Sequence, residues 1–335
     1  MKRILVIRGG AIGDFVLTLP AIKLLRDAFP NANLEIVGYK HIVALADQRF
    51  YAQATRSIEY ASFASFFARG AALPAELADY FATFELVVSY LFDPDRVFEQ
   101  HLEGCGVNIF LAANPKITGE THAAVQLALP LRQLDLALSD PAAVLFPSAA
   151  DRESAASFLA RSNAPVVALH PGSGSESKNW PLERWTELGE SLLDSGSAPS
   201  LVIVGGEADQ KQLRSLESVW RGQNVAFAEN LPLPELAAVL SRCALFIGHD
   251  SGISHIAAAA GAPCVLLFGR TDPAVWAPMN AQVRVLRPAS ELLTDLQYQE
   301  VCDAVHVLMR RNASTSSSRA SADGEGPHAH RQCDP

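Results

Sequence analysis

Short hydrophobic runs alternate with amphipathic segments through the first 135 residues. Residues 3–7 and 34–38 are mostly apolar, which is typical of strands buried on both faces. Between them, residues 15–29 carry Leu and Ala near helical spacing. This alternation predicts a doubly wound parallel sheet. The same pattern predicts further strands at 85–90 and 107–111 and helices around 94–103 and 121–132.

A second alternating series follows residue 165. Periodicity weakens between residues 134 and 165, a stretch that contains three prolines, so we place a domain boundary there and expect domains at 1–150 and 151–311. The segment 312–335, rich in Ser, Ala, Gly and His, is expected to form a disordered tail. The second series predicts strands at 166–170, 200–204, 224–228, 244–247 and 264–268 and helices at 182–193, 208–220, 233–240 and 291–309.

Composition agrees with two folded domains and excludes some partners. The chain has 335 residues, more than a single hydrophobic core usually organises. Hydrophobic residues make up 49% and charged residues 19%, which is typical of a globular protein. The formal net charge of −9 argues against a general nucleic-acid binder. Two Rossmann-like halves would hold their ligands at the strand ends, in a cleft between them.

Cysteine usage and the start of the chain predict a cytoplasmic protein. The five cysteines are scattered without a Cys-x-x-Cys pair, which favours reduced thiols over disulfides or a zinc site. Only four apolar residues stand between Arg3 and Arg8, too few for the core of a signal peptide. Peripheral docking on the inner face of the cytoplasmic membrane stays open. No metal-ligand cluster is visible in the sequence, so we expect no metal.

The most informative motif is Gly-His-Asp-Ser-Gly-Ile-Ser-His at residues 248–255, between an apolar strand and a small-residue helix. Asp250 or Ser251 can cap that helix, and Gly252 lets a ligand approach the backbone. With His255 as a further donor, the amide groups of the first turn form an anion site suited to a diphosphate. The alternative is an ordinary capped helix packed on a sheet.

Two further motifs follow predicted strands in the second half. Residues 170–181 contain two glycines, three serines and a lysine, and Ser173, Ser175 and Lys178 suit phosphate oxygens. A surface loop with a chance lysine is the alternative. In Gly-Gly-Glu-Ala-Asp at residues 205–209, Glu207 is placed either to bind ribose hydroxyls or to cap a helix.

The first strand leads into a glycine turn, Arg-Gly-Gly-Ala-Ile-Gly-Asp at residues 8–14. Its glycine spacing does not fit a dinucleotide-binding loop, and the chain has no Gly-Lys-Ser/Thr phosphate loop. The turn presents Asp14 at a helix start, either as a helix cap or, in a cleft, as a general base. Arg8 and Gly13, in the same turn, are candidate residues of the loop on the acceptor side.

Together these motifs resemble glycosyltransferase family 9, the ADP-heptose:lipopolysaccharide heptosyltransferases. They occur in the order of that family and cover roughly residues 1–310, although residues 40–135 carry little that matches. The matching pieces are Gly-Ala-Ile-Gly-Asp-Phe-Val-Leu-Thr-Leu-Pro-Ala, His-Pro-Gly-Ser-Gly-Ser with Lys-Asn-Trp-Pro, Gly-Gly-Glu-Ala-Asp, Asp-Ser-Gly-Ile-Ser-His, and Gly-Arg-Thr-Asp-Pro with Trp-Ala-Pro.

The resemblance implies a GT-B fold, with acceptor contacts on the N-terminal domain and nucleotide-sugar contacts on the C-terminal one. It implies an inverting, metal-independent transfer in which Asp14 matches the general base. The ADP-sugar is then a substrate, no cofactor is required, and the acceptor is a lipopolysaccharide-core or related glycan or glycolipid. Matching donor contacts are Ser173, Ser175, Lys178, Glu207, Asp250, Ser251, Gly252 and His255.

Two features depart from the family pattern and leave other functions open. The basic excess near the N-terminus is modest for a large anionic lipid acceptor, and Arg270 stands where the family often has proline. One alternative is a nucleotide-sugar-binding sensor or partner protein without turnover. Another is a different GT-B enzyme of sugar nucleotides, such as an epimerase. The glycine pattern disfavours an NAD dehydrogenase.

Overall fold

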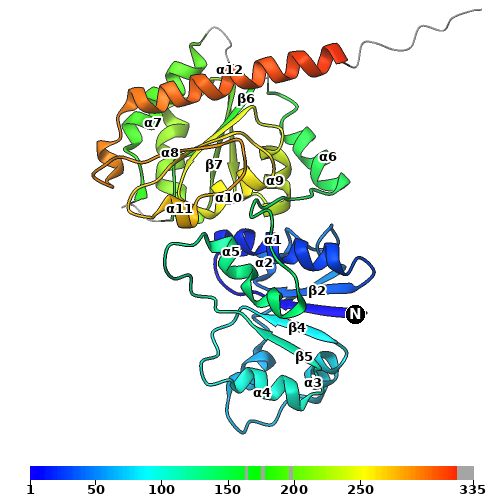
Figure 1. Cartoon of the computed structure of the whole chain (residues 1–335). Helices are drawn as coiled ribbons and strands as arrows, with labels where there is room; N and C mark the ends of the chain where they lie inside the picture. The colour runs from blue at the N-terminus through cyan, green and yellow to red at the C-terminus, as the bar shows by residue number, and fades with distance from the viewer. Residues whose placement is uncertain (163–164, 175–177, 196–198, 323–335) are drawn as a thin grey trace, which may run out of the picture.

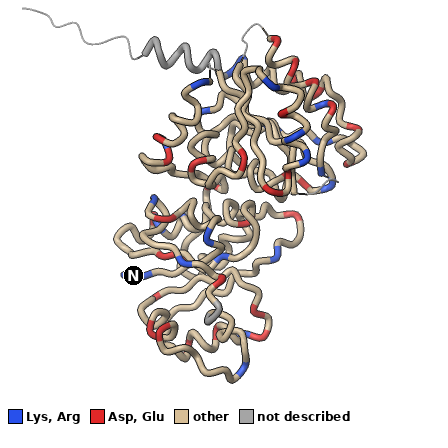
Figure 2. The backbone as a smooth tube through the Cα atoms, turned by 180° about the vertical axis from the view of Figure 1, so that it is seen from behind, with Lys and Arg blue, Asp and Glu red and all other residues tan. Residues whose placement is uncertain are grey.

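The computed structural model describes residues 1–162, 165–174, 178–195 and 199–322, with the backbone alone for 61–62 and 312–322. These residues form two α/β domains, one above the other in Figure 1. Acidic and basic residues are interspersed over both domains (Figure 2). None of the described helices is both long and apolar enough to cross a membrane.

The N-terminal domain is built on a parallel sheet with strand order β3-β2-β1-β4-β5. Side chains alternate along β1, so Ile4 and Val6 pack toward α1 and α5, whereas Leu5 and Ile7 pack toward η1, α3 and α4. The strands are β1 (Arg3–Ile7), β2 (Asn33–Gly38), β3 (Ala54–Ser57), β4 (Leu86–Ser89) and β5 (Ile109–Ala112). The helices are α1 (Ile12–Ala28), α2 (Lys40–Val43), η1 (Ala61–Phe67), α3 (Ala75–Ala82), α4 (Val97–Gly104), α5 (Ala123–Ala128) and η2 (Leu129–Leu134).

The C-terminal domain repeats the design with the parallel order β11-β10-β9-β6-β7-β8. Helices α7, α8 and α12 cover one face of this sheet, and α6, α9 and α10 cover the other. The strands are β6 (Val166–His170), β7 (Ser200–Gly205), β8 (Val225–Glu229), β9 (Leu245–His249), β10 (Cys264–Leu267) and β11 (Val283–Leu286). The helices are α6 (Ala149–Phe158), α7 (Leu182–Leu193), η4 (Glu207–Asp209), α8 (Gln210–Val219), α9 (Leu233–Leu240), α10 (Gly252–Ala259), α11 (Pro273–Trp276), η5 (Leu293–Asp295) and α12 (Tyr298–Ala322).

In both sheets the strand order reverses beside the first strand, between β1 and β4 and between β6 and β9. Ligands of open α/β sheets bind at such switch points, outside the carboxyl ends of the strands. Helices α1 and α10 follow β1 and β9, and they pack against each other across the two domains. The two switch points therefore face each other.

Two glycines allow this close approach of α1 and α10. A Cβ on Gly252 would lie 2.6 Å from Cβ of Ile12, and one on Gly13 would lie 3.2 Å from the ring of His255. Any larger residue would push the domains apart at this point. The long connection between the sheets adds further ties, including the bidentate pair of Arg49 with Asp151 at the start of α6.

The end of the chain differs from the sequence prediction. The expected helix at 291–309 begins only at Tyr298, because residues 293–295 form the separate 3₁₀ turn η5. Helix α12 then continues to Ala322, so the expectation of a disordered tail from residue 312 was wrong for 312–322. The Ala, Ser and Arg residues there can extend a helix whose first turns are already packed on the sheet. Residues 323–335 lie outside the described part of the chain.

Candidate functional site

A cavity of about 500 Å³ lies between the glycine turn of the N-terminal domain and the strand ends of the C-terminal domain. Residues 10–13 form one wall together with Tyr39 and His41. The opposite wall comes from the ends of β6, β7 and β9, including Ser173, Glu207 and residues 251–253. The sequence motifs from both halves of the chain thus meet at one place.

A second cavity of about 560 Å³ continues from the first along the domain boundary. The two share Ile12, His41, Gly206, Glu207 and Ile253. The second extends over the loop between β8 and α9. Its far end is lined by the apolar residues Leu231 and Pro232 with their neighbours. Together the cavities form a groove with a polar end at α10 and an apolar end at α9, which suits an elongated ligand with a charged and a flat apolar part.

Asp14 contacts the first turn of its own helix and is not among the residues that line the cavity. Its Oδ2 accepts a hydrogen bond from the backbone N–H of Ala11 at 2.9 Å, which stabilises the first turn of α1. Its Oδ1 lies 3.5 Å from Nη2 of Arg8, and about a third of the side chain, 33%, stays exposed. Gly10, at a φ of +97°, leaves the room for this carboxylate. Asp14 follows directly after the cavity wall formed by Gly13.

Arg8 lies beneath the turn and does not line the cavity. Its Nε donates to Oγ1 of Thr18 at 3.0 Å, and its guanidinium lies 5.7 Å from the ring centre of Tyr90. Burial lowers the pKa of Arg8, and the neighbouring Asp14 carboxylate opposes that shift. Arg8 therefore stabilises the negative charge of the Asp14 carboxylate from the buried side of the turn.

At the start of α10, Ser251 and not Asp250 caps the helix. The hydroxyl oxygen of Ser251 accepts a hydrogen bond from the backbone N–H of Ser254 at 3.4 Å. Asp250 instead accepts a hydrogen bond from Nζ of Lys178 at 2.8 Å. Since Lys178 is 46% exposed, this pair is open to exchange with a bound anion.

Ser173 and Glu207 line the cavity, and their expected contact with a donor stays a prediction. The hydroxyl of Ser173 donates to Oδ1 of Asn179 at 2.7 Å, and Glu207 is exposed. Ser175 lies outside the described residues. The structure therefore places Ser173, Glu207, Ser251 and Gly252 in the cavity wall. Lys178 and Asp250 pair with each other next to Ser251 and do not line the cavity.

His255 is placed differently from its expected role. Its side chain is buried beside Gly13, in the contact between α1 and α10, and is not part of the cavity wall. Burial lowers its pKa to about 4, so the ring is neutral near pH 7. The helix position alone could not reveal this, because the docking of the two domains decides which side of α10 faces the groove.

Two further residues of the cavity wall were not singled out in the sequence analysis. His170 and Asp209 both line the cavity, and Nε2 of His170 lies 3.5 Å from Oδ2 of Asp209. Burial works against ionisation of Asp209, but hydrogen bonds from His170 and the Gly206 N–H outweigh it and hold the pKa low. Both residues belong to recognised motifs, and the sequence held no signal that the two would meet.

His249 ties the loop after β6 to the sheet. Its Nδ1 contacts the carbonyl oxygen of Gly172 at 3.1 Å, and its Nε2 accepts from the backbone N–H of Trp180 at 2.8 Å. With Nε2 as the acceptor, Nδ1 carries the proton and donates to Gly172. Burial lowers the pKa of His249 to about 3. This neutral histidine fixes both ends of the segment that carries Ser173 and Lys178.

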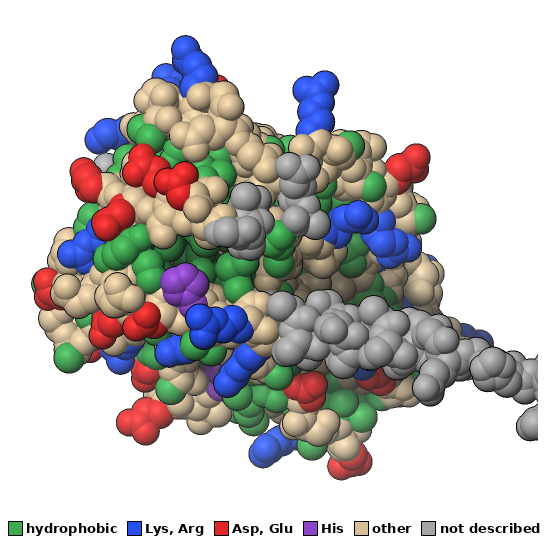
Figure 3. All heavy atoms as spheres, turned by 90° about the horizontal axis from the view of Figure 1, so that it is seen from above, with side chains coloured by type: hydrophobic (Ala, Val, Ile, Leu, Met, Phe, Trp, Pro, Cys, Tyr) green, Lys and Arg blue, Asp and Glu red, His purple; other side chains and the backbone are tan. Residues whose placement is uncertain are grey.

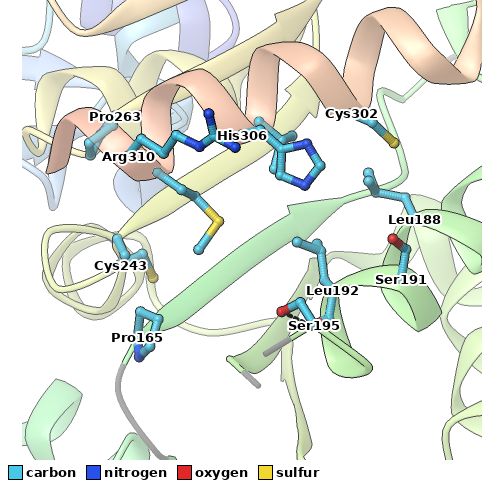
Figure 4. A pocket seen from close by; sticks show the side chains of 13 residues that line it. Pro165, Leu188, Ser191, Leu192, Ser195, Cys243, Pro263, Cys302, His306 and Arg310 are labelled. Carbon is cyan, nitrogen blue, oxygen red and sulfur yellow. Dashed lines mark hydrogen bonds between the residues drawn. The ribbon is translucent and has the colours of Figure 1, made fainter. Parts of the chain in front are cut away.

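The largest cavity lies away from these residues. About 730 Å³ in volume, it lies under α12 and is lined mostly by apolar side chains such as Leu188, Leu192 and Pro263 (Figure 4). Seen from the α12 end, the molecule shows hydrophobic side chains between charged ones (Figure 3). None of the predicted site residues lines this cavity, so its size does not make it the candidate site. Among the described residues, no group of three or more His, Cys, Asp or Glu could hold a metal ion.

Two facing Rossmann-like domains with a polar groove between them define a GT-B protein, and solved structures of this fold agree. A family 9 glycosyltransferase from Veillonella parvula covers 92% of this chain and 97% of its own, at a TM-score of 0.76 and 20% identity. The Escherichia coli heptosyltransferase WaaC with ADP covers 91% of this chain and 99% of its own, at a TM-score of 0.69 and 17% identity.

The sequence comparison identifies the family. The profile of glycosyltransferase family 9 (heptosyltransferase) matches residues 111–306, more than half of the chain, so the protein belongs to this family of glycosyltransferases. Lipopolysaccharide heptosyltransferase 2 of Escherichia coli K12 is 27% identical over 135 residues, which are 39% of this chain and 38% of that protein. The match thus spans about two fifths of the length of this curated relative.

Proposed function

We propose that the protein transfers a heptose, or a related sugar, from an ADP-sugar to a lipopolysaccharide-core or related glycan acceptor, with inversion at the anomeric carbon. The observation that carries this proposal is the meeting of the Asp14 turn with the α10 start across one groove. Family membership supports a glycosyl transfer, and the curated relative named above is a lipopolysaccharide heptosyltransferase. The proposed domains are 1–150 for the acceptor and 151–311 for the donor.

The proposed donor site is the groove on the C-terminal side. The diphosphate would lie at the start of α10, where backbone amides, Ser251 and Ser173 can donate hydrogen bonds. Lys178 would leave Asp250 for a phosphate oxygen, which offers it a stronger charge-assisted contact. Glu207 lines both cavities and is placed between the polar and the apolar end, as a ribose contact requires.

The proposed reaction is a single displacement. The acceptor hydroxyl loses its proton to Asp14 as its oxygen attacks the anomeric carbon, and the bond from that carbon to the diphosphate oxygen breaks. Attack from the face opposite the leaving group inverts the configuration. Lys178 and the amides of α10 stabilise the negative charge that develops on the departing ADP. The ADP-sugar enters as a substrate, and no cofactor takes part in this scheme.

The acceptor would approach from the N-terminal domain, on the side of the glycine turn. We propose a glycan or glycolipid as the acceptor and a cytoplasmic location with contact to the inner face of the membrane, which family membership supports. Residues 1–60 support an anionic acceptor weakly, since they carry eight Lys and Arg against five Asp and Glu. An acidic balance over the whole chain makes nucleic acid an unsuitable partner.

A transfer assay tests this proposal. Purified protein is incubated with ADP-heptose and a lipopolysaccharide precursor that lacks heptose, and the lipid product is analysed by mass spectrometry and NMR. We expect the mass of one heptose unit to be added, with the anomeric configuration opposite to that of the donor. Donor binding without transfer to any acceptor would favour the sensor alternative. Chemical change of the donor without acceptor would favour an epimerase-like enzyme.

A further inference from the structure

Three polar side chains form a continuous row behind the proposed diphosphate site. Oδ2 of Asp209 lies 3.5 Å from Nε2 of His170, and Nδ1 of His170 lies 3.3 Å from Oγ of Ser251. The three residues come from η4, the end of β6 and the start of α10. All three reach the cavity wall, although His170 and Asp209 are buried.

The local structure is shaped to hold the Asp209 carboxylate in this row. A Cβ on Gly172 would lie 1.8 Å from Oδ1 of Asp209, so only glycine fits at that position. Oδ2 of Asp209 also accepts from the backbone N–H of Gly206 at 3.0 Å. The carboxylate is therefore fixed, ionised and turned toward His170.

The position of Asp209 decides how the hydrogens of the row are arranged. When His170 is neutral, the carboxylate favours the proton on Nε2, and Nδ1 must then accept from the hydroxyl of Ser251. In that arrangement the Ser251 hydroxyl has no proton left for a ligand. When both ring nitrogens are protonated, Nδ1–H donates to Ser251, and the hydroxyl proton is released from His170. It can then point to a ligand in the cavity or to Oγ of Ser254, which lies 3.3 Å from Oγ of Ser251.

The charges around His170 make the second arrangement accessible to a bound anion. Asp209 faces Nε2 on one side, and the other titratable ring in contact range, His249, stays neutral because burial lowers its pKa to about 3. The Lys178–Asp250 pair at the rim carries no net charge. A diphosphate beside Ser251 would therefore add negative charge that a protonated His170 compensates.

We propose that His170 takes up a proton from solvent when the donor's diphosphate binds, and that this proton releases the Ser251 hydroxyl to donate to the diphosphate. Asp209 acts as the positioning residue that keeps the imidazole in place. The inference rests on the proposed function, because it requires an ADP-sugar at α10. It assigns to two residues of the family motifs a role in sensing the anionic donor.

Calorimetry measures this proton directly. ADP-heptose is titrated into the full-length protein at pH 7.5 in two buffers of different ionisation enthalpy, HEPES and Tris. Since a sugar diphosphate has no group of its own that titrates near pH 7.5, a buffer-dependent heat reports on protein protonation. We expect the heat to differ between the two buffers in the direction of proton uptake by the wild-type protein.

Variants test which side chain of the row takes up the proton. His170→Asn should abolish the uptake and weaken ADP-heptose binding, since the amide can contact Ser251 but cannot be protonated. Asp209→Asn should reduce the uptake and serves as the test if the first variant does not fold. His306→Asn removes an exposed histidine outside both cavities of the groove and should leave the uptake unchanged. Thermal unfolding is recorded for each variant.

The outcomes separate the inference from the function beneath it. If the wild-type protein fails to bind ADP-heptose in either buffer, the proposed function falls. If it binds with the same heat in both buffers, only the present inference is overturned. An uptake that survives in His170→Asn, or that disappears in His306→Asn, would equally overturn it.

Discussion

Substitution of Asp14 separates its two possible contributions, because asparagine keeps one and loses the other. In Asp14→Asn, the amide oxygen can still accept the Ala11 N–H that Oδ2 accepts at 2.9 Å, so the cap of α1 stays in place. The amide cannot take a proton from the acceptor. Asp14→Ala removes both functions and leaves the Ala11 N–H without its partner.

The expected magnitudes follow from these contacts. Loss of a general base lowers the rate by about 10²–10⁴-fold, roughly 3–5 kcal/mol in the activation free energy, and this applies to both variants. Loss of the cap costs about 1 kcal/mol in the free energy of unfolding and applies only to Asp14→Ala. Since Asp14 lies on the acceptor side, the affinity for ADP should change little in either variant.

The assay combines the transfer rate, ADP calorimetry and urea unfolding for wild type and both variants. We expect Asp14→Asn to be stable, to bind ADP and to be nearly inactive. An Asp14→Asn protein that keeps more than about a tenth of the wild-type rate would refute the base assignment, because the rate loss would then lie outside the range for such a catalyst. If only Asp14→Ala loses activity, and loses stability with it, Asp14 is a helix cap.

Three further predictions concern burial, a domain contact and metal dependence. The pKa of His255 is about 4 in the folded protein against about 6.5 in the unfolded chain, so the folded protein binds fewer protons. Lowering the pH from 7 to 5 should therefore reduce the free energy of unfolding by about 2 kcal/mol. Urea unfolding should show that this loss is absent in His255→Asn and kept in His306→Asn, a control at an exposed histidine. Arg49→Met leaves Asp151 buried without its partner and should cost about 3–5 kcal/mol at pH 7. Burial opposes the low pKa of Asp151, but its hydrogen bonds outweigh burial, so the wild-type advantage should fade as the pH drops below about 4; an equal loss at pH 3 would contradict this. In the proposed reaction, Lys178 and the amides of α10 stabilise the negative charge on the departing ADP, so EDTA should leave the transfer rate unchanged. A rate that EDTA abolishes and that returns only with added metal would contradict this role.

Buried strands were the easiest elements to predict from sequence. Arg3–Ile7 and Val166–His170 agree with β1 and β6 residue for residue, since both lie in sheet interiors and are mostly apolar. Strand β3, Ala54–Ser57, was missed because it lies at a sheet edge, where Thr55 and Ser57 are only partly buried and Arg56 is exposed. Leu292, Leu293 and Leu296, in and around η5, are spaced as in a helix and led to the early beginning predicted for the last helix.

For the site, the sequence indicated the segments but could not give their mutual geometry. The Asp14 turn and the α10 start follow strands at switch points, so strand order alone predicts that they lie near a ligand. The contact of His170 with Asp209 depends on the pairing of β6 with β7, which a single sequence does not encode in any local pattern. The burial of His255 depends on how the two domains pack against each other, which no local sequence pattern indicates.

Donor selectivity is the central claim, and one calorimetric comparison tests it most directly. The purified protein is titrated with ADP-heptose, UDP-N-acetylglucosamine and NAD under identical conditions. We predict that ADP-heptose binds, with the two comparators weaker by at least about tenfold, or 1.4 kcal/mol. A preference for the UDP-sugar would contradict the ADP-heptose assignment while leaving the fold intact, and a preference for NAD would contradict the transferase account itself.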